Sequence, residues 1–291
     1  MYKKELVSMC SFYAVSPMHA GSGSATGAVD LPIQRERHTQ WPHVQASAVK
    51  GAMRAHFRNY ANEKESINQI FGSDTQDQKY PGAGDGIPGA ISVSDAKLLA
   101  FPVRSNIAPF VSVTSPGVLK RLQSDLKMTG IDKDFSLPEF PEKDKAVSIN
   151  FTPEHDRIVL EDALVTTTAR ADIPFLKEKL GDVERLLLIS DAMFDHIVTT
   201  CTEVQTQIKI NHEKGTAQDG ALRYEELLPC DTAMYSIVHY SCQNFETPIQ
   251  AEIIQTFVQE NIVDFIQIGG DETLGRGICR ISWINGKGGE A

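Results

Sequence analysis

The feature that most constrains this fold is residues 16–46, a long segment whose composition favours neither a helix nor a strand. It contains prolines at positions 17, 32 and 42 and glycines at positions 21, 23 and 27, which interrupt regular backbone hydrogen bonding. Apolar–polar alternation predicts a strand over residues 4–15, and "ASAVKGAMRAHFRNYAN" predicts the helix that follows the segment. A loop this long inside a compact domain is usually functional or disordered, so its side chains are the first candidates for a site.

The remaining segments predict an α+β chain. Apolar periodicity with terminal signals predicts helices in "ESINQIFGS", in "SPGVLKRLQSDLKMTG" with Ser115 and Gly130 as its caps, and in "TPIQAEIIQTFVQENI" with Thr247 as its cap. Ser47 is the expected N-cap of the first helix. Strands are predicted in "GAISVSDAKLLAFPV", "TAMYSIVHYSC", "DFIQI" and "ICRISWI". This order fits a ferredoxin-like or RRM-like palm of the βαββαβ type with antiparallel strands.

Long insertions interrupt this order. Residues 204–227 alternate, break at a glycine-containing polar stretch and then resume, which predicts a protruding β-hairpin with an exposed tip. Residues 60–90 and 130–160 are expected to be irregular insertions, because prolines and other turn-forming residues recur in them. We therefore expect a single domain, residues 1–291, that carries one hairpin and two irregular insertions.

Composition and charge exclude several classes of protein. No run of about 18 apolar residues is present, so no transmembrane helix is expected. The five cysteines are scattered and form no CxxC pair, which favours free thiols in a reducing, cytoplasmic compartment over disulfides or a zinc site. The net charge of −10 argues against nucleic acid, but residues 1–60 hold seven Lys or Arg against three acids. One basic segment on an acidic chain indicates a single surface that faces a polyanion.

Asp30 is the one acidic residue in the glycine-rich part of the long segment. Arg35, Arg37 and His38 follow it and could hold a polyanion beside its carboxylate. On the residues alone, a helix-capping or turn carboxylate that pairs with Arg35 is the favoured interpretation.

Two glycine-rich segments are weak signals when taken alone. Gly21, Ser22 and Gly23 form no GxGxxG and are not followed directly by a helix, which argues against a dinucleotide site. Residues 269–277, "GGDETLGRG", lie between two predicted strands. They are either a plain strand connection or a backbone cradle for phosphate beside Arg276.

Taken together, three motifs are specific. "SPMHAGSGSATGAVDLPIQRERHTQWPHVQASAVKGAMR", the hairpin "TAQDGALRYEELLP" and the late "GGDETLGRG" closely resemble the RAMP superfamily of CRISPR effector proteins. Within it, they resemble the repeated backbone subunit of the type III-B (Cmr) complex. The resemblance implies a helical filament made of further copies of the chain and other subunits of the Cmr complex, bound to guide (CRISPR) RNA.

The resemblance also implies an activity. Such subunits use a thumb hairpin to displace a nucleotide of the guide–target duplex at regular intervals, and target RNA is cut beside each displaced position with a divalent metal, Mg²⁺ or Mn²⁺. Asp30 matches the family's cleavage residue and is the expected metal ligand, because Mg²⁺ commonly binds one carboxylate together with substrate phosphates. His19 is expected to contact RNA first and to assist proton transfer second. Glu225 and Glu226 match acids suspected of aiding cleavage, although a polar strand end beside a half-buried Tyr224 is at least as good an interpretation.

The same resemblance implies an RNA-binding set. Lys50 and Gly51 match an "S-x-x-K-G" element whose lysine faces guide phosphates, against the alternative of a solvated basic helix face. The expected RNA-binding residues are Gly21, Ser22, Gly23, Arg35, Arg37, His38, Ser47, Lys50, Gly51, Arg54, Gly269, Gly270, Gly275 and Arg276. Three alternatives stay open: a non-catalytic RNA-binding scaffold, an endonuclease that processes the guide precursor without metal, and an unrelated ferredoxin-like oligomer without RNA.

Overall fold

The computed structural model describes residues 6–58, 64–73, 88–131, 135–179, 183–242 and 249–286. The strands of its large sheet are β1 (Leu6–Ala14), β2 (His43–Val44), β3 (Ile91–Val93), β4 (Ala96–Arg104), β5 (Phe110–Thr114), β6 (Lys145–Ile149), β7 (Arg157–Leu160), β8 (Ala163–Ala171), β9 (Leu186–Leu188), β14 (Ala233–Tyr240), β15 (Phe265–Gln267) and β16 (Ile278–Asn285). The helices are α1 (Ala46–His56), α2 (Lys64–Phe71), α3 (Pro116–Thr129), α4 (Pro174–Lys179), α5 (Asp191–Thr200) and α6 (Ala251–Asn261). The α+β class predicted from the sequence is confirmed.

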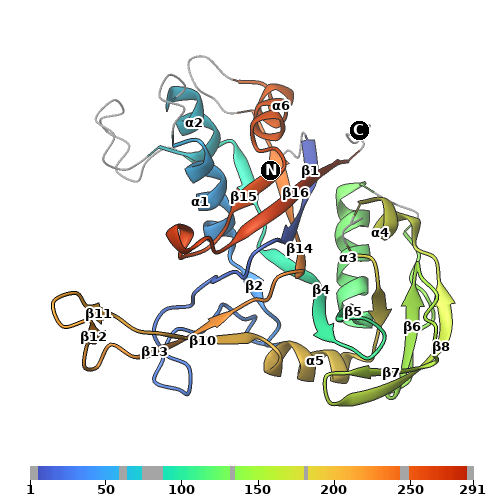
Figure 1. Ribbon diagram of the computed structural model, residues 1–291. Coiled ribbons are helices and arrows are strands. Elements are labelled where there is room, and N and C mark those ends of the chain that lie inside the picture. The colour runs from blue at the N-terminus through green and yellow to red at the C-terminus, as the bar shows by residue number, and fades with distance from the viewer. Residues whose placement is uncertain are drawn as a thin grey trace.

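The sheet has the strand order β15-β16-β1-β14-β4-β5-β9-β6-β8-β7, with β2 paired to β4 and β3 paired to β14. From β15 to β4 every pairing is antiparallel, and α1 and α6 pack on this half. The half from β5 to β7 mixes parallel and antiparallel pairs. Figure 1 shows α1, α2 and α6 grouped beside the first half and α3 and α4 beside the second.

Local sequence explains both ends of α3. The Ser115 hydroxyl accepts a hydrogen bond from the Val118 amide, and Gly130 ends α3 with a left-handed φ of 68°, both as predicted. The predicted N-cap of the first helix is wrong, because α1 is capped at Gln45 rather than at Ser47. A tertiary contact explains the difference: the Asp95 carboxylate accepts the Ala46 amide at 2.7 Å and satisfies an orphan donor of the first turn.

One predicted irregular insertion is wrong. Residues 130–160 contain β6 and β7, because the prolines at 138, 141 and 153 lie outside the apolar runs "KAVSI" and "RIVL" and leave both free to pair. In the 60–90 segment, α2 forms where "ESINQIFGS" predicts a helix, and residues 74–87 lie outside the described part of the chain. The cap predicted at Thr247 also lies outside it, and α6 begins at Ala251.

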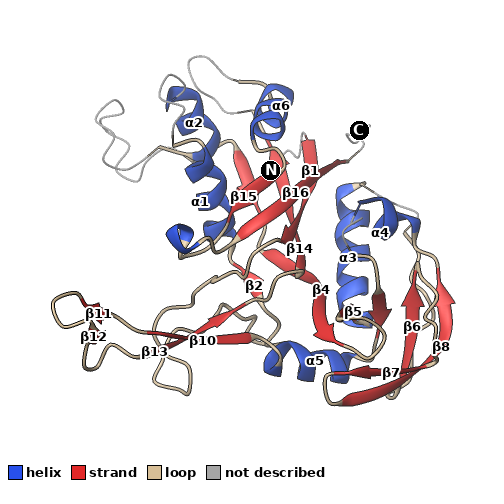
Figure 2. Ribbon diagram, in the orientation of Figure 1, coloured by secondary structure: helices blue, strands red, loops and turns tan. Residues whose placement is uncertain are grey.

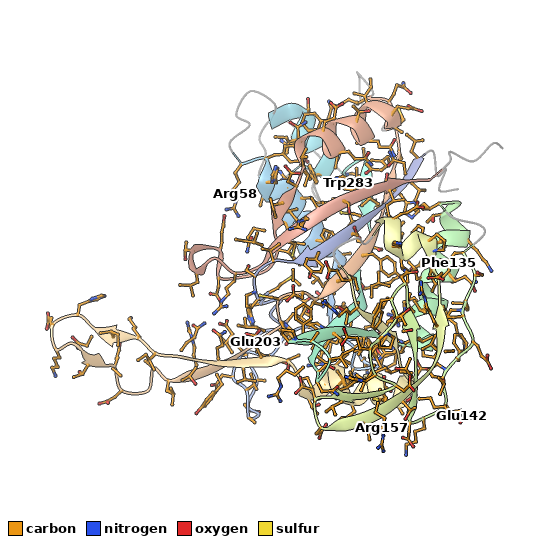
Figure 3. All side chains as sticks on the ribbon, turned by 45° about the vertical axis from the view of Figure 1, so that its right-hand side comes forward. Arg58, Phe135, Glu142, Arg157, Glu203 and Trp283 are labelled. Atoms are coloured by element: carbon orange, nitrogen blue, oxygen red, sulfur yellow. The ribbon has the colours of Figure 1, made fainter. Side chains whose placement is uncertain are left out.

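A two-stranded hairpin projects from the body of the molecule. β10 (Glu203–Gln207) pairs antiparallel with β13 (Arg223–Leu227), and β11 (Ile210–Asn211) pairs with β12 (Thr216–Ala217) farther out. Figures 2 and 3 show the hairpin extending away from the rest of the chain, with Glu203 at its base. Several apolar side chains along it are exposed: Val204, Ile208, Leu222 and Tyr224.

Two further features concern the cysteines and the length of the helices. None of the five cysteines, all of which lie in the described ranges, forms a disulfide, and Cys10 and Cys279 are buried, as small apolar side chains commonly are. Within the described ranges, no helix has the length and apolar character needed to cross a membrane.

Candidate functional site

Three segments that are far apart in the sequence meet at the base of the hairpin. One arm of the long loop pairs with β13 through Leu31 and Glu225. The other arm carries His19, whose carbonyl accepts the Gly270 amide at 2.8 Å. The glycine loop, residues 269–277, is thereby joined to the long loop beside the hairpin.

Asp30 is held against the hairpin by Tyr224. The Tyr224 amide donates to Asp30 Oδ2 at 2.7 Å, and the Tyr224 carbonyl accepts the Asp30 amide at 3.1 Å. The side chain is half-buried, and no donor among the described residues reaches its other oxygen, Oδ1. An ion pair with Arg35 is not found, because Arg35 binds Glu226 instead. Asp30 therefore offers one free oxygen at a fixed place.

Glu226 joins the long loop to the hairpin as an ionised carboxylate. Arg35 Nη2 lies 2.6 Å from Glu226 Oε1, and the Thr202 hydroxyl and the Ile33 amide donate to the same carboxylate at 2.7 and 3.0 Å. Burial would raise the pKa of Glu226, but these hydrogen bonds outweigh it and lower that pKa below its usual value. Arg35 also donates to the Val198 carbonyl at 2.9 Å. Both side chains have a structural role, whereas the cleavage and RNA-binding roles expected of them stay predictions.

His19 has a fixed ring orientation. Its Nδ1 lies 2.8 Å from the Glu226 carbonyl, which can only accept, so Nδ1 carries a proton. Its Nε2 lies 3.6 Å from Glu225 Oε1. A Cβ on Gly21 would come within 2.5 Å of this nitrogen, so a side chain at position 21 would displace the ring from this orientation. The ring is thus placed between a buried acid and the glycine-rich arm of the loop.

A cavity of about 350 Å³ opens beside His19. Small side chains of α1 and backbone of the two glycine segments form much of its wall, and its lining residues are His19, Ala20, Gly21, Gln34, Ala48, Gly51, Ala52, Ala55, Arg58, Gln267, Gly269 and Gly270. Gly269 has a φ of 91°, and a Cβ there would lie 2.3 Å from the His19 carbonyl oxygen. Five predicted site residues, His19, Gly21, Gly51, Gly269 and Gly270, therefore meet at one cavity. Such a wall suits the sugar–phosphate chain of a nucleic acid better than its bases.

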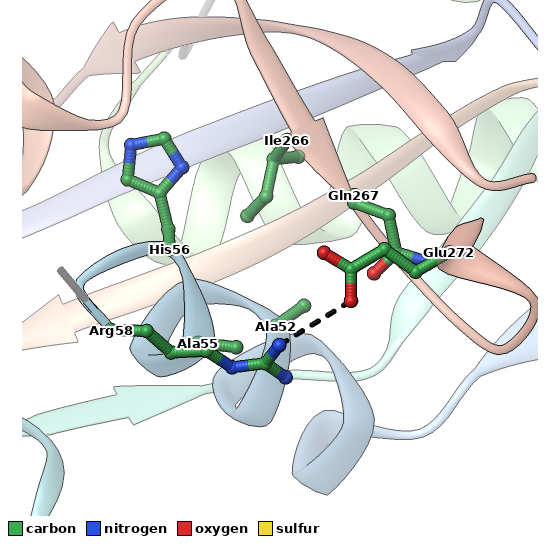
Figure 4. A pocket seen from close by; sticks show the side chains of 7 residues that line it. All are labelled: Ala52, Ala55, His56, Arg58, Ile266, Gln267 and Glu272. Carbon is green, nitrogen blue, oxygen red and sulfur yellow. Dashed lines mark hydrogen bonds and ion pairs between the residues drawn. The ribbon is translucent and has the colours of Figure 1, made fainter. Parts of the chain in front are cut away.

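A second hollow of about 400 Å³ adjoins the first. The two share four lining residues, Ala52, Ala55, Arg58 and Gln267. Figure 4 shows Arg58 reaching Glu272, with Nη1 and Oε2 3.3 Å apart. Both side chains are exposed, so the pair contributes only about 0–1 kcal/mol and is easily opened by an incoming anion.

Lys50 and Arg54 on the first helix do not form the solvated basic face that was the alternative, because both side chains bind backbone carbonyls. Lys50 Nζ donates to the Ile91 carbonyl at 3.1 Å, and burial, followed by the nearby Arg54, lowers the pKa of Lys50. Arg54 donates to the Gly72 carbonyl at 2.6 Å. Arg58, the next member of the i, i+4 series, is the one that reaches the cavity. It is absent from the expected RNA-binding set, although its spacing of four from Arg54 is a visible signal.

The other predicted RNA-binding residues do not line the cavity. Six of them are exposed: Ser22, Gly23, Arg37, His38, Ser47 and Gly275. Arg276 is half-buried and donates to the side chain of Gln205 in β10. Its guanidinium therefore joins the glycine loop to the hairpin, and its expected contact with phosphate stays a prediction.

The divalent metal that the resemblance implies would find one protein carboxylate here. Among the described residues, no group of three His, Cys, Asp or Glu side chains is placed to hold a metal ion. Asp30 Oδ1 is the available ligand, and Mg²⁺ commonly binds one or two carboxylates together with substrate phosphates. The residues fit a cation that is shared with bound RNA, rather than one held by the protein alone.

Comparison with known proteins assigns this geometry to a family. The sequence profile of the RAMP superfamily matches residues 11–280. The chain belongs to the RAMP superfamily. The matched range includes the long loop, the hairpin and the glycine loop, so every part of the candidate site lies within the RAMP region.

Two curated RAMP relatives match nearly the whole chain. The chain is 33% identical to the CRISPR system Cmr endoribonuclease Cmr4 of Pyrococcus furiosus over 293 residues, which cover 94% of each protein. It is 24% identical to the CRISPR system CMR subunit Cmr4 of Saccharolobus solfataricus, again over 94% of each.

Solved structures of RAMP proteins have a similar fold. The crystal structure of oligomeric Cmr4 from Pyrococcus furiosus matches with a TM-score of 0.69 and 27% identity, covering 96% of this chain and 98% of the other. A chain of the type III-B Cmr-beta complex bound to cognate target RNA matches with a TM-score of 0.73, covering 96% and 97%. Its identity is 20%, so this second match shows the fold alone.

Proposed function

We propose that this RAMP protein is the backbone subunit of a type III-B CRISPR effector, where it binds guide RNA and cleaves complementary target RNA at regular intervals. Its similarity to a Cmr endoribonuclease over 94% of both chains supports this function. One observation carries the cleavage activity: Asp30 stands at the hairpin base with one oxygen bound by the Tyr224 amide and the other free.

The fold supports a division into palm and thumb. Numbered along the chain, β1, β4, β14 and β16 are the first to fourth strands of an antiparallel set, and their spatial order is fourth, first, third, second. This is the order of a ferredoxin-like βαββαβ palm. The β10–β13 hairpin is then the thumb, which enters the guide–target duplex and bends the target strand.

The cavity beside His19 holds the guide. Backbone and small side chains line much of it, so they contact the sugar–phosphate chain without reading bases, as a carrier of many different guides requires. Arg58 supplies a positive charge at its edge. Further copies of the chain continue the filament with the other Cmr subunits in the cytoplasm, and the oligomeric Cmr4 structure supports this assembly.

Cleavage uses the 2′-hydroxyl next to the scissile phosphate. The hydroxyl gives up its proton and attacks phosphorus, the bond from phosphorus to the 5′-oxygen breaks, and that oxygen takes a proton from water, which leaves a 2′,3′-cyclic phosphate and a 5′-hydroxyl. The bend imposed by the thumb brings the attacking and departing oxygens into line. Asp30, held through Oδ2 by the Tyr224 amide, offers its other oxygen to the strand, and His19, held through Nδ1 by the Glu226 carbonyl, offers Nε2 to take the proton of the hydroxyl. A Mg²⁺ or Mn²⁺ ion bound by Asp30 and RNA phosphates would supply Lewis acidity.

Replacement of Asp30 tests this function. In an assembled complex loaded with guide, Asp30→Asn should lower the rate of target cutting by on the order of a hundredfold, while guide binding stays the same. Asp162→Asn, an exposed aspartate between β7 and β8, is the matched control and should cut normally. Metal dependence is measured by adding EDTA and then Mg²⁺ or Mn²⁺.

The outcomes distinguish the alternatives. Normal cutting by Asp30→Asn would favour the alternative that the protein is a non-catalytic RNA-binding scaffold. Cutting of a guide precursor by the isolated chain in EDTA would favour the processing endonuclease. RNA binding that does not weaken with rising salt, or no binding, would favour an oligomeric protein without RNA.

A further inference from the structure

Residues 36–41 of the long loop form a closed turn with a fixed backbone. The Glu36 amide donates to the Trp41 carbonyl at 2.9 Å, and the Gln40 amide donates to the Glu36 carbonyl at 2.8 Å. Gln40 has a left-handed φ of 61°, and its side-chain amide donates to the Arg37 carbonyl at 2.9 Å. The 36–41 turn therefore has its shape before any ligand arrives.

Glu36 joins this turn to α3. Arg121 of α3 donates to both oxygens of the Glu36 carboxylate, at 2.6 and 2.9 Å, and the Thr39 hydroxyl donates to Oε2 at 2.6 Å. Burial would raise the pKa of Glu36, but these hydrogen bonds outweigh it and lower that pKa below its usual value. A bidentate pair of this kind fixes orientation as well as distance, so the turn is held firmly against α3.

Trp41 joins the same turn to α5. Its Nε1 donates to Asp195 Oδ1 at 2.6 Å, and its ring meets Phe194 edge to face, with the centroids 5.4 Å apart. The Arg121 guanidinium lies 4.9 Å from the Trp41 ring centroid. A Cβ on Gly117 would lie 2.9 Å from this ring, so the glycine leaves room for it. Because α5 lies at the base of the hairpin (Figure 1), the turn is fixed beside the candidate site.

Arg37 lies in this fixed turn, and its guanidinium has no partner. It is exposed, and within the described ranges Arg37 and Arg157 are the two arginines whose side chains bind no other residue. The neighbouring His38 is 76% exposed, and its Nε2 lies 3.9 Å from Glu36 Oε2, beyond the range of a hydrogen bond. A guanidinium presents several donors in one plane, which matches the oxygens of a phosphate. The turn thus carries a cation that is free to bind one.

We propose that Arg121 and Trp41 are positioning residues, which fix the 36–41 turn so that Arg37 binds a phosphate of the RNA at the candidate site. The inference rests on the proposed function, which brings RNA to Asp30. Arg37 is seven residues from Asp30, so the two lie at most about 25 Å apart. Because the backbone of the turn is already ordered, Arg37 loses less freedom when it binds, which raises the affinity. Such a contact has no base preference.

Three substitutions separate the phosphate contact from the groups that position it. Arg37→Met removes the guanidinium itself. Arg121→Met removes the bidentate pair with Glu36 and leaves Arg37 in the chain. Gly117→Ala displaces the Trp41 ring and changes no charge, so it carries the test where Arg121→Met fails to fold. Each positioning variant is also made together with Arg37→Met, since coupled residues show losses that do not add.

Two arginines supply the matched controls. Arg157→Met removes the other arginine without a partner, which lies on β7, the last strand of the sheet (Figure 3). Arg104→Met breaks another arginine–glutamate pair, in which Arg104 Nε donates to Glu161 at 2.7 Å. Both change the net charge as the test variants do. Thermal unfolding of every variant checks that it is folded at the temperature of the binding measurement.

The measurement is RNA affinity as a function of salt concentration. One arm uses guide RNA with the full chain, and the other uses target RNA with the guide-loaded complex, so the arm that responds shows which strand Arg37 contacts. Arg37→Met should weaken binding roughly three- to tenfold and lower the slope of log affinity against log salt by about one. Arg121→Met and Gly117→Ala should each weaken binding by a similar factor, but neither should add a loss to Arg37→Met.

Other results would overturn the proposal. Affinities of Arg37→Met equal to those of Arg157→Met in both arms would mean that the turn binds no phosphate. An effect of Arg121→Met no larger than that of Arg104→Met, with none from Gly117→Ala, would mean that the turn needs no support. Losses that multiply in the double variants would mean that the support does not act through Arg37. If wild type does not cut while binding follows the expected pattern, the proposed cleavage fails and the phosphate contact stands.

Discussion

The two sides of β13 use adjacent glutamates in opposite ways. Glu226 faces the long loop and binds Arg35, and its hydrogen bonds lower its pKa. Glu225 faces the glycine loop, and burial together with Asp271 raises its pKa. Both side chains are at least nine-tenths buried, so the partner decides the difference: a guanidinium on one side and a second acid on the other. Glu226 therefore forms a fixed ion pair, whereas the charge of Glu225 depends more strongly on the pH.

The largest expected effect follows from breaking the ion pair between Arg35 and Glu226. Arg35→Met leaves an ionised Glu226 buried without its cation and should lower the free energy of unfolding by about 3–5 kcal/mol, as measured by urea denaturation. The double variant Arg35→Met/Glu226→Gln should recover part of this loss, because no uncompensated charge remains. A loss below about 1 kcal/mol in the single variant would contradict the ionised state assigned to Glu226.

The next effect concerns the close approach between Gly269 of the glycine loop and the His19 carbonyl. Gly269→Ala places a Cβ 2.3 Å from the His19 carbonyl oxygen at a φ of 91° and should destabilise the fold by at least about 1–2 kcal/mol. Gly51→Ala is the control, since a Cβ there meets nothing within 4 Å and should stabilise α1 by roughly 0.5–1 kcal/mol. Thermal unfolding of both variants checks the pair, and equal melting temperatures would show that the loop does not need a glycine there.

The smallest expected effect is that the two glutamates make stability depend on pH in opposite directions. The folded chain keeps the Glu225 proton at pH values where the unfolded chain has released it, so stability falls as the pH rises from the usual glutamate range through the raised pKa. Glu226 contributes with the opposite sign, because its stabilisation is lost as the pH falls through its lowered pKa. In urea titrations from pH 4 to 8, Glu225→Gln should remove the first slope and keep the second. A wild-type slope in Glu225→Gln would mean that this carboxyl does not hold the proton.

The parts of the site that depend on local geometry were predictable from the sequence. Gly21 and Gly269 lie where a Cβ would come within 2.5 and 2.3 Å of His19 atoms, and a glycine in the sequence marks such close approaches, although each glycine segment is a weak signal when taken alone. The α3 caps are equally local, since a serine hydroxyl and a left-handed glycine act within one turn of the helix.

The choice of ionic partner could not be predicted. Arg35 lies five residues from Asp30 but binds Glu226, 191 residues away, because the fold buries that carboxylate beside it. Asp271 meets Glu225 for the same reason. Charge patterns show which groups could pair, whereas burial decides which of them do, and burial depends on strands that come from distant parts of the chain.

The position of β1 has a consequence for how the chain folds. This first strand lies between β14 and β16, so both of its sheet partners are made more than 200 residues later, and the cavity beside His19 requires a loop that precedes the last strand. Contacts of such long sequence separation form slowly. During synthesis β1 must wait unpaired until β14, more than 200 residues later, has left the ribosome, and the site becomes complete only when the glycine loop has followed.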